Sequence, residues 1–191
     1  MNNILFCSAG RRCRLIKDFK ETIGNTGKII VAENSMYAPA RYVADVAYTV
    51  PKITSEDYIE KILDICKNED VKCILTLIDP EIEILSKNRE KFEKNGILVM
   101  TPGEISAQIC FDKYEMYKYL KKNNIPTTVT YGSIEEFKES LKKNQIHFPV
   151  FVKPRTGSGS VGARKIYDIK HLEDVMKEDE TLIIQEFMNA V

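Results

Sequence analysis

The sequence predicts an α/β fold in which a doubly wound parallel sheet is followed by a small α+β unit. Up to about residue 100, short apolar runs alternate strictly with helical patterns, which is typical of a parallel sheet with helices on both faces. After residue 124 the order changes, and three or four strand patterns accompany two helical patterns. The chain of 191 residues is long enough for one large domain or two small ones.

In the first half, each apolar run predicts a strand and each helical pattern a helix. The expected strands are 3–7, 28–32, 47–50, 72–78 and 96–100, and the expected helices are 11–23, 55–68 and 79–92. Ser55 and the acidic residues after it suit the start of the second helix. Asp79 and Glu81 are expected to cap the third helix, with substrate contact as the alternative. Ligands of such sheets bind beyond the carboxyl ends of the strands, where these acids and the clusters 8–12 and 33–34 fall.

The segment Thr101–Gly103 is the expected boundary of the first domain. Two helices, 104–110 and 112–122, should follow it, and then strands at 127–131, 147–153, 164–167 and 181–186 with helices at 133–143 and 170–176. We therefore predict three parts, namely a sheet domain over 1–105, linker helices over 106–124 and a small α+β lobe over 125–191.

Charge and cysteine content exclude several classes of function. Lys and Arg together number 28, as do Asp and Glu, so no net field attracts nucleic acid or an anionic membrane. No apolar run approaches the length of a membrane-spanning helix. The five cysteines form no Cys-x-x-Cys pair, and the two histidines do not favour zinc. We expect buried, reduced cysteines in a cytoplasmic protein.

The strongest motif is an apolar run, Phe148–Val152, that leads to Lys153 and then to a loop of small residues. Glycine allows left-handed conformations and a close approach of N–H groups to an anion, and a lysine adds a point charge. The loop members are Ser158, Gly159, Ser160, Val161 and Gly162. Because the lysine precedes the glycines and another strand follows, this is not a P-loop, and we predict a β-hairpin lid over a polyphosphate. The alternative is a plain hairpin loop with a solvated lysine.

The order of motifs resembles the ATP-grasp superfamily, in particular the carbamoyl-phosphate synthase large-chain type. The motifs are Phe111–Tyr114, Asn124–Thr128, Phe148–Pro154, the glycine loop and Ile183–Phe187. The resemblance covers essentially the whole chain and implies a Rossmann-like pre-ATP-grasp domain, followed by the N-terminal lobe of the grasp. The second lobe of the grasp is absent, so the chain is expected to be part of a longer protein.

The resemblance implies a role for each matching residue. Lys113 and Lys153 would reach the nucleotide phosphates, and residues Ser158–Gly162 would form the flap over them. Glu186, Phe187 and Met188 would form the hinge that meets adenine. The cofactors would be ATP and Mg²⁺, with the metal ligands in the absent lobe. The partners would be a small carboxylate and an amine, without nucleic acid or membrane, and a homodimer is compatible with the family.

Other readings stay open at this point. The native protein could be a non-catalytic nucleotide-binding or scaffolding module, or a Rossmann-type protein that binds NAD(P) or a nucleotide sugar through Ser8–Arg12 and Glu33. The single Gly10 of that turn argues against the second reading. Arg11 and Arg12 could hold an anion at a helix start or be solvated. Arg155 receives no role, and the aromatic run is expected in a helix core; its members are Phe111, Tyr114, Tyr117 and Tyr119.

Overall fold

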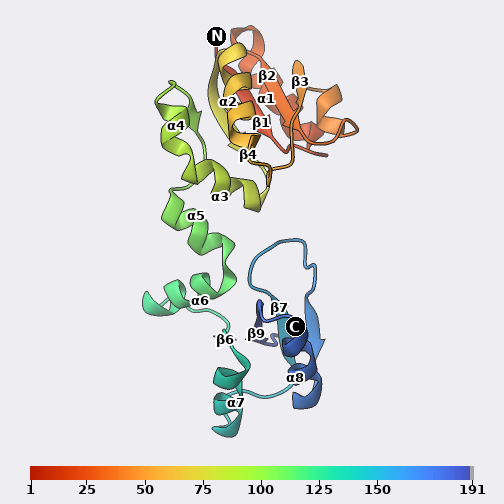
Figure 1. Ribbon diagram of the computed structural model, residues 1–191, viewed down its shortest axis with the longest axis vertical. Helices are drawn as coiled ribbons and strands as arrows, with labels where there is room; N and C mark the ends of the chain where they lie inside the picture. The colour runs from red at the N-terminus through yellow and green to blue at the C-terminus, as the bar shows by residue number, and fades with distance from the viewer. Residues whose placement is uncertain (190–191) are drawn as a thin grey trace. The chain divides into compact units, whose positions relative to one another are not determined.

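The computed structural model describes residues 1–189 of the chain. It divides into two compact units, Met1–Ala107 and Gln108–Val191, each with its own sheet and core (Figure 1). We call them the N-terminal unit and the C-terminal unit. The division falls within helix α5 (Glu104–Phe111).

The N-terminal unit contains a five-stranded sheet with the order β3-β2-β1-β4-β5, in which every neighbouring pair is parallel. The chain begins at the central strand and moves outward to both edges, which confirms the predicted doubly wound sheet. The strands are β1 (Asn3–Cys7), β2 (Ile29–Glu33), β3 (Val46–Thr49), β4 (Val71–Thr76) and β5 (Leu98–Val99). The helices are α1 (Cys13–Ile23), α2 (Tyr58–Asn68), α3 (Asp79–Lys87) and α4 (Arg89–Glu93), with short 3₁₀ turns at Gly24–Thr26 and Pro39–Tyr42.

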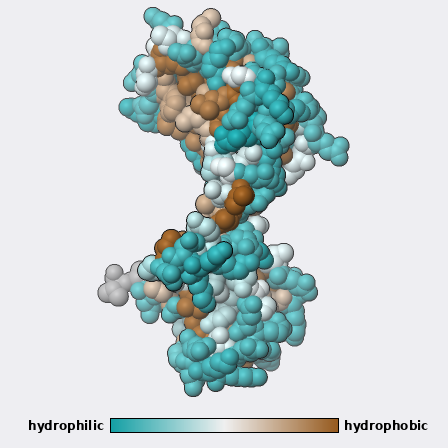
Figure 2. Space-filling model, turned by 90° about the vertical axis from the view of Figure 1, so that its left-hand side faces the viewer, coloured by the Kyte–Doolittle hydropathy of each residue, from teal (hydrophilic) through white to brown (hydrophobic). Residues whose placement is uncertain are grey.

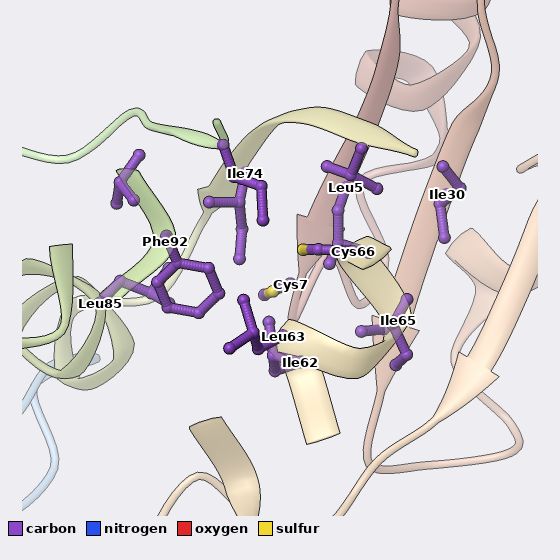
Figure 3. Packing of buried hydrophobic residues seen from close by; sticks show 14 of the residues in the cluster. Leu5, Cys7, Ile30, Ile62, Leu63, Ile65, Cys66, Ile74, Leu85 and Phe92 are labelled. Carbon is purple, nitrogen blue, oxygen red and sulfur yellow. The ribbon is translucent and has the colours of Figure 1, made fainter. Parts of the chain in front are cut away.

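Both faces of this sheet are buried. Successive side chains of β1 point to opposite faces, so Leu5 and Phe6 belong to different hydrophobic clusters. Leu5 joins Phe92 of α4 in the cluster of Figure 3. Phe6 joins Ile16 of α1, and its ring meets that of Phe19 edge-on at 4.9 Å between centroids. Burial on both faces explains why the strands are continuous apolar runs in the sequence.

All three predicted helices of this unit have other bounds in the structure, and α2 begins at Tyr58 rather than at residue 55. Helix α1 begins at Cys13 rather than at residue 11, because Arg12 is its N-cap residue with ψ 49°. The pattern over 79–92 holds two helices, α3 and α4. Asn88 ends α3, and its side-chain amide donates to the carbonyl of Ile84 at 2.9 Å.

The predicted side-chain caps of α2 and α3 are absent among the residues described here. Asp57, not Ser55, stands at the N-cap of α2, and its side chain makes no cap hydrogen bond. Ile78 precedes α3, so Asp79 and Glu81 lie inside the first turn. A carboxylate there still interacts favourably with the helix dipole, but Glu81 has turned into the protein interior and is fully buried.

The C-terminal unit contains a four-stranded antiparallel sheet with the order β6-β9-β7-β8. Its strands are β6 (Thr130–Tyr131), β7 (Val150–Pro154), β8 (Arg164–Ile166) and β9 (Leu182–Glu186), and its helices are α6 (Lys113–Lys122), α7 (Ile134–Lys142) and α8 (Ile169–Glu178). Ser133 caps α7 and Asp168 caps α8 through their side-chain oxygens. This sheet confirms the predicted small α+β unit.

The surface carries scattered apolar groups on a mostly hydrophilic face (Figure 2). Within residues 1–189, no helix is long and apolar enough to cross a membrane. The prediction of buried cysteines holds for Cys7 and Cys66 but is wrong for Cys110, which is exposed. The prediction of an aromatic helix core is wrong too. The rings of Tyr114 and Tyr117 stack 6.2 Å apart on a partly exposed face of α6.

Candidate functional site

One face of the C-terminal sheet is buried and the other bears polar groups. Side chains alternate along β7, so Val150 and Val152 face the core that α7 and α8 build, while Phe151 and Lys153 point the opposite way. Gln185 of β9 pairs with Phe151 and so shares that second face. The antiparallel register therefore brings an aromatic ring, an ammonium group and an amide together.

The loop between β7 and β8 has the hairpin connection that the sequence predicts. Its backbone is left-handed at several positions, namely Gly157, Gly159, Ser160 and Gly162. At Gly162, with φ 74°, an added Cβ would lie only 3.0 Å from Cγ of Pro154, so both conformation and space require glycine there. A backbone of this kind can turn its N–H groups toward an anion.

This loop, called the glycine loop below (residues 155–163), encloses a cavity of about 230 Å³. The cavity is lined by Lys113, Phe151, Lys153, Pro154, Thr156, Gly157, Ser158, Gly159, Ser160, Val161 and Ala163. None of these lining residues is acidic. The structure thus gathers both predicted lysines and four of the predicted flap residues, Ser158 to Val161, around one space, while Gly162 supports the loop without lining it.

The two lysines approach the cavity from different elements. Lys113 is the first residue of α6, and its Nζ donates to the carbonyl oxygen of Gly157 at 2.8 Å. Lys153 lies on the same face of β7 as Phe151, and its Nζ donates to Oε1 of Gln185 at 2.7 Å. Burial, and next the charge of Lys113, lowers the pKa of Lys153. Two ammonium groups beside one cavity favour an anionic ligand, because its charge relieves their repulsion.

A second cavity, of about 220 Å³, lies at the end of β9. It is lined by Phe151, Gln185, Glu186, Phe187 and Met188, which include all three predicted hinge residues. Phe151 lines both cavities, so the two spaces adjoin. At the hinge, Nζ of Lys165 from β8 lies 3.7 Å from the ring centroid of Phe187. A planar apolar group and a polyanion could therefore occupy neighbouring positions.

Sequence reasoning missed Phe151 and Gln185. The signal was present in the strand period, because Phe151 lies two residues before Lys153 and so must share its face. Gln185 could be found only through the pairing of β7 with β9, which the sequence does not fix. Its amide also donates to the hydroxyl of Thr130 at 2.9 Å, which orients the oxygen toward Lys153.

The polar clusters of the N-terminal unit are occupied by internal partners. The N–H of Gly10 donates to Oε1 of Glu33 at 2.7 Å, and Nη2 of Arg12 donates to the carbonyl of Leu77 at 2.8 Å. At the start of the first helix, where an anion site was one of two alternatives for Arg11 and Arg12, the N–H of Gly10 is thus bonded to a carboxylate of the protein itself. The same contact occupies the side chain of Glu33, which the alternative reading of a Rossmann-type protein assigned to NAD(P) or a nucleotide sugar.

Glu81 is likewise satisfied inside the N-terminal unit. Its two carboxylate oxygens accept hydrogen bonds from the hydroxyls of Tyr58 and Thr76. It lies in the interior, so the structure gives no support to substrate contact by this residue. Across residues 1–189, no group of three or more His, Cys, Asp or Glu side chains is arranged to hold a metal ion.

A parallel α/β unit followed by an antiparallel sheet with two lysines at its open face is the architecture of the ATP-grasp class of proteins. Comparison with family models places the chain in that class. Residues 4–100 match the family described as PylC-like, N-terminal domain, to which the chain belongs, and residues 110–191 match the ATP-grasp domain.

The curated relatives are ligases and carboxylases by name. D-alanine–D-alanine ligase B of Clostridium perfringens is 41% identical over 94 residues, covering 46% of this chain and 31% of the relative. The propionyl-CoA carboxylase alpha chain of Ruegeria pomeroyi is 27% identical over 172 residues, covering 85% of this chain and 24% of the relative. The chain thus spans about a third or less of the length of these relatives.

Solved structures share the fold over the full chain. N5-carboxyaminoimidazole ribonucleotide synthetase from Thermotoga maritima matches with a TM-score of 0.73 at 22% identity, over 99% of this chain and 47% of that one. The biotin carboxylase domain of the Hydrogenobacter thermophilus 2-oxoglutarate carboxylase, solved with MgADP and bicarbonate, matches with a TM-score of 0.73 at 20% identity, over 98% and 44%. At these identities the likeness establishes the fold.

Proposed function

We propose that this chain is the nucleotide-binding part of an ATP-dependent ligase that activates a carboxylate as an acyl phosphate for attack by an amine. One observation carries the proposal. Two adjoining cavities, which share Phe151, are lined respectively by two lysines with a glycine loop and by the hinge at the end of β9. Membership of the ATP-grasp class supports the same assignment.

In this proposal the first cavity takes the phosphates of ATP. Lys113 and Lys153 neutralise their charge, and the glycine loop covers them with N–H groups and hydroxyls. The second cavity takes the adenine, which would lie against Phe151 and Phe187 and bond to the main chain of Glu186 and Met188. The hinge would contact adenine through backbone groups, and the pairing of β9 with β7 fixes the position of the first of them, Glu186.

The whole protein would carry out the proposed reaction in two steps. A carboxylate oxygen forms a bond to the γ-phosphorus as the bond to the β-bridging oxygen breaks, and ADP leaves. An amine nitrogen then attacks the acyl carbon, the bond to the phosphoryl oxygen breaks, and phosphate departs while the nitrogen loses a proton. The residues of this chain would act by positioning ATP and stabilising its charge.

Magnesium would neutralise the β- and γ-phosphates when bound. The described residues do not fit it, since they contain no cluster of metal-binding side chains. We therefore propose that its ligands come from the second lobe of the grasp. The carbamoyl-phosphate synthase-like subdivision, the homodimer and the cytoplasmic location stay predictions.

The proposal is tested by ADP release from the intact natural protein, supplied with MgATP and pools of small carboxylates and amines. We expect steady-state release of ADP that requires both the carboxylate and the amine and is lost in Lys153→Met. ATP binding without release under any pool would favour the non-catalytic nucleotide-binding module. Absence of ATP binding would overturn the proposed function.

A further inference from the structure

Arg155 is a cation of the glycine loop that turns away from the cavity. The residues on either side of it, Pro154 and Thr156, line the cavity, whereas Arg155 does not. Its Nε lies 2.5 Å from Oδ2 of Asp112, and its Nη2 lies 2.7 Å from Oε1 of Glu115. Since Nε and Nη2 are bound to the N-cap of α6 and to α6 itself, and Arg155 does not line the cavity, we do not assign it as a direct phosphate ligand.

The ring of Tyr114 supports this arginine from α6. The guanidinium carbon of Arg155 lies 5.4 Å from the ring centroid, a cation–π distance. The Tyr114 hydroxyl donates to Glu136 at 3.1 Å, and the ring packs so closely on Gly132 that a Cβ there would come within 2.5 Å of it. The ring on which the arginine lies is therefore itself held by Gly132, which follows β6, and by Glu136 of α7.

The main chain of Arg155 connects this anchor to the candidate phosphate site. Its carbonyl oxygen accepts the N–H of Lys113 at 2.9 Å, and its N–H donates to the carbonyl of Thr181 at 3.0 Å. The ammonium group of Lys113 lies 3.5 Å from the same carbonyl and 2.8 Å from that of Gly157. The place of the Lys113 ammonium beside the cavity thus depends on where the first residues of the loop are held.

We propose that Arg155 is a positioning residue of this site. Its ion pairs with Asp112 and Glu115 hold the first residues of the glycine loop against α6, and this places Lys113 at the phosphates. The inference rests on the proposed function and deepens it. An arginine is required because a planar fork can reach two carboxylates while it lies on an aromatic ring. A lysine can engage only one of them in that position, so Arg155→Lys restores the site only in part.

The test is a double-mutant cycle on the affinity of the intact natural protein for MgATP, using wild type, Arg155→Gln, Lys113→Met and the double variant. Arg155→Gln is expected to weaken binding about fivefold, the upper end for a part-exposed ion pair. In the Lys113→Met background the same change is expected to cost less than about twofold, because coupled residues are not additive. A purely structural role would give the same loss in both backgrounds.

The matched control is Lys138→Gln, which breaks the 2.5 Å ion pair with Glu173 away from the cavity. Its side chain is 39% exposed, as is that of Arg155, and affinity should not change. If Arg155→Gln does not fold, Arg155→Lys and Glu115→Gln replace it in the cycle. Equal losses in both backgrounds, or no loss from any of these variants, would overturn the inference alone. A wild-type protein that does not bind MgATP would instead overturn the proposed function.

Discussion

Both units place a glycine-containing turn directly after an interior strand, but they use it in opposite ways. In the N-terminal unit the N–H of Gly10 is already bonded to the carboxylate of Glu33. In the C-terminal unit the glycine loop lines a cavity with Lys113 and Lys153, and none of the residues that line it is acidic. From this difference we expect a glycine turn to bind an external anion only where its N–H groups are not already bonded to the protein and cations converge on it.

The largest expected effect is on nucleotide affinity when Lys153 loses its charge. Lys153→Met should weaken MgATP binding by about 10- to 100-fold, because a hydrogen bond to a charged group contributes roughly 1.5–3 kcal/mol. Calorimetric titration of the intact protein measures it. Lys170→Met, on the exposed side of α8, is the control and should bind as wild type does. Equal affinity in Lys153→Met would place the phosphates elsewhere.

A substitution at the glycine turn of the N-terminal unit should lower the stability of the protein rather than its affinity for nucleotide. Glu33→Ala leaves the part-buried N–H of Gly10 without its acceptor, which should lower the free energy of unfolding by about 1 kcal/mol. Urea unfolding followed by circular dichroism measures the loss. MgATP affinity should not change, and a parallel loss of affinity would mean that this turn takes part in the nucleotide site.

A comparable effect on stability is expected from glycine replacement in the loop. Gly162→Ala forces alanine into a left-handed conformation, which costs about 1–2 kcal/mol, and adds a contact with Pro154. Gly96→Ala is the matched control, since its φ is 73° and nothing lies within 4 Å of the added Cβ. Thermal unfolding should show a larger loss for Gly162→Ala. Equal losses would show that the loop shifts freely and does not press on β7.

The smallest effect is a pH dependence of the N-terminal unit. Burial raises the pKa of Glu33 above its ordinary value of 4.5, against the opposing hydrogen bonds from the N–H groups of Gly10 and Ala9. A raised pKa in the folded state means that the stability from this group is full below 4.5 and is lost as pH rises through the folded value. Glu33→Gln should flatten that slope in urea unfolding between about pH 4 and pH 8. An unchanged slope would mean that another titratable group causes the pH dependence of stability.

Local sequence patterns predicted the fold and part of the candidate site. The alternation up to residue 100 fixes the parallel sheet, and the run ending at Lys153 fixes the hairpin with its loop. The break at Asn88 could not be seen, because one residue with ψ 9° interrupts a continuous helical pattern. Sequence patterns did not identify the roles of Arg155 and Gln185, because each role depends on a partner that is distant in the sequence. Arg155 pairs with Asp112, 43 residues earlier, and Gln185 pairs with Lys153, 32 residues earlier.

The most direct test of the central claim is amide hydrogen exchange of the intact protein with and without MgATP. We predict that nucleotide slows exchange in the glycine loop and at Gln185–Met188, while the turn at Ser8–Arg12 exchanges as before, because Glu33 already occupies it. Protection at Ser8–Arg12, with none in the glycine loop, would contradict the account and move the nucleotide to the N-terminal sheet.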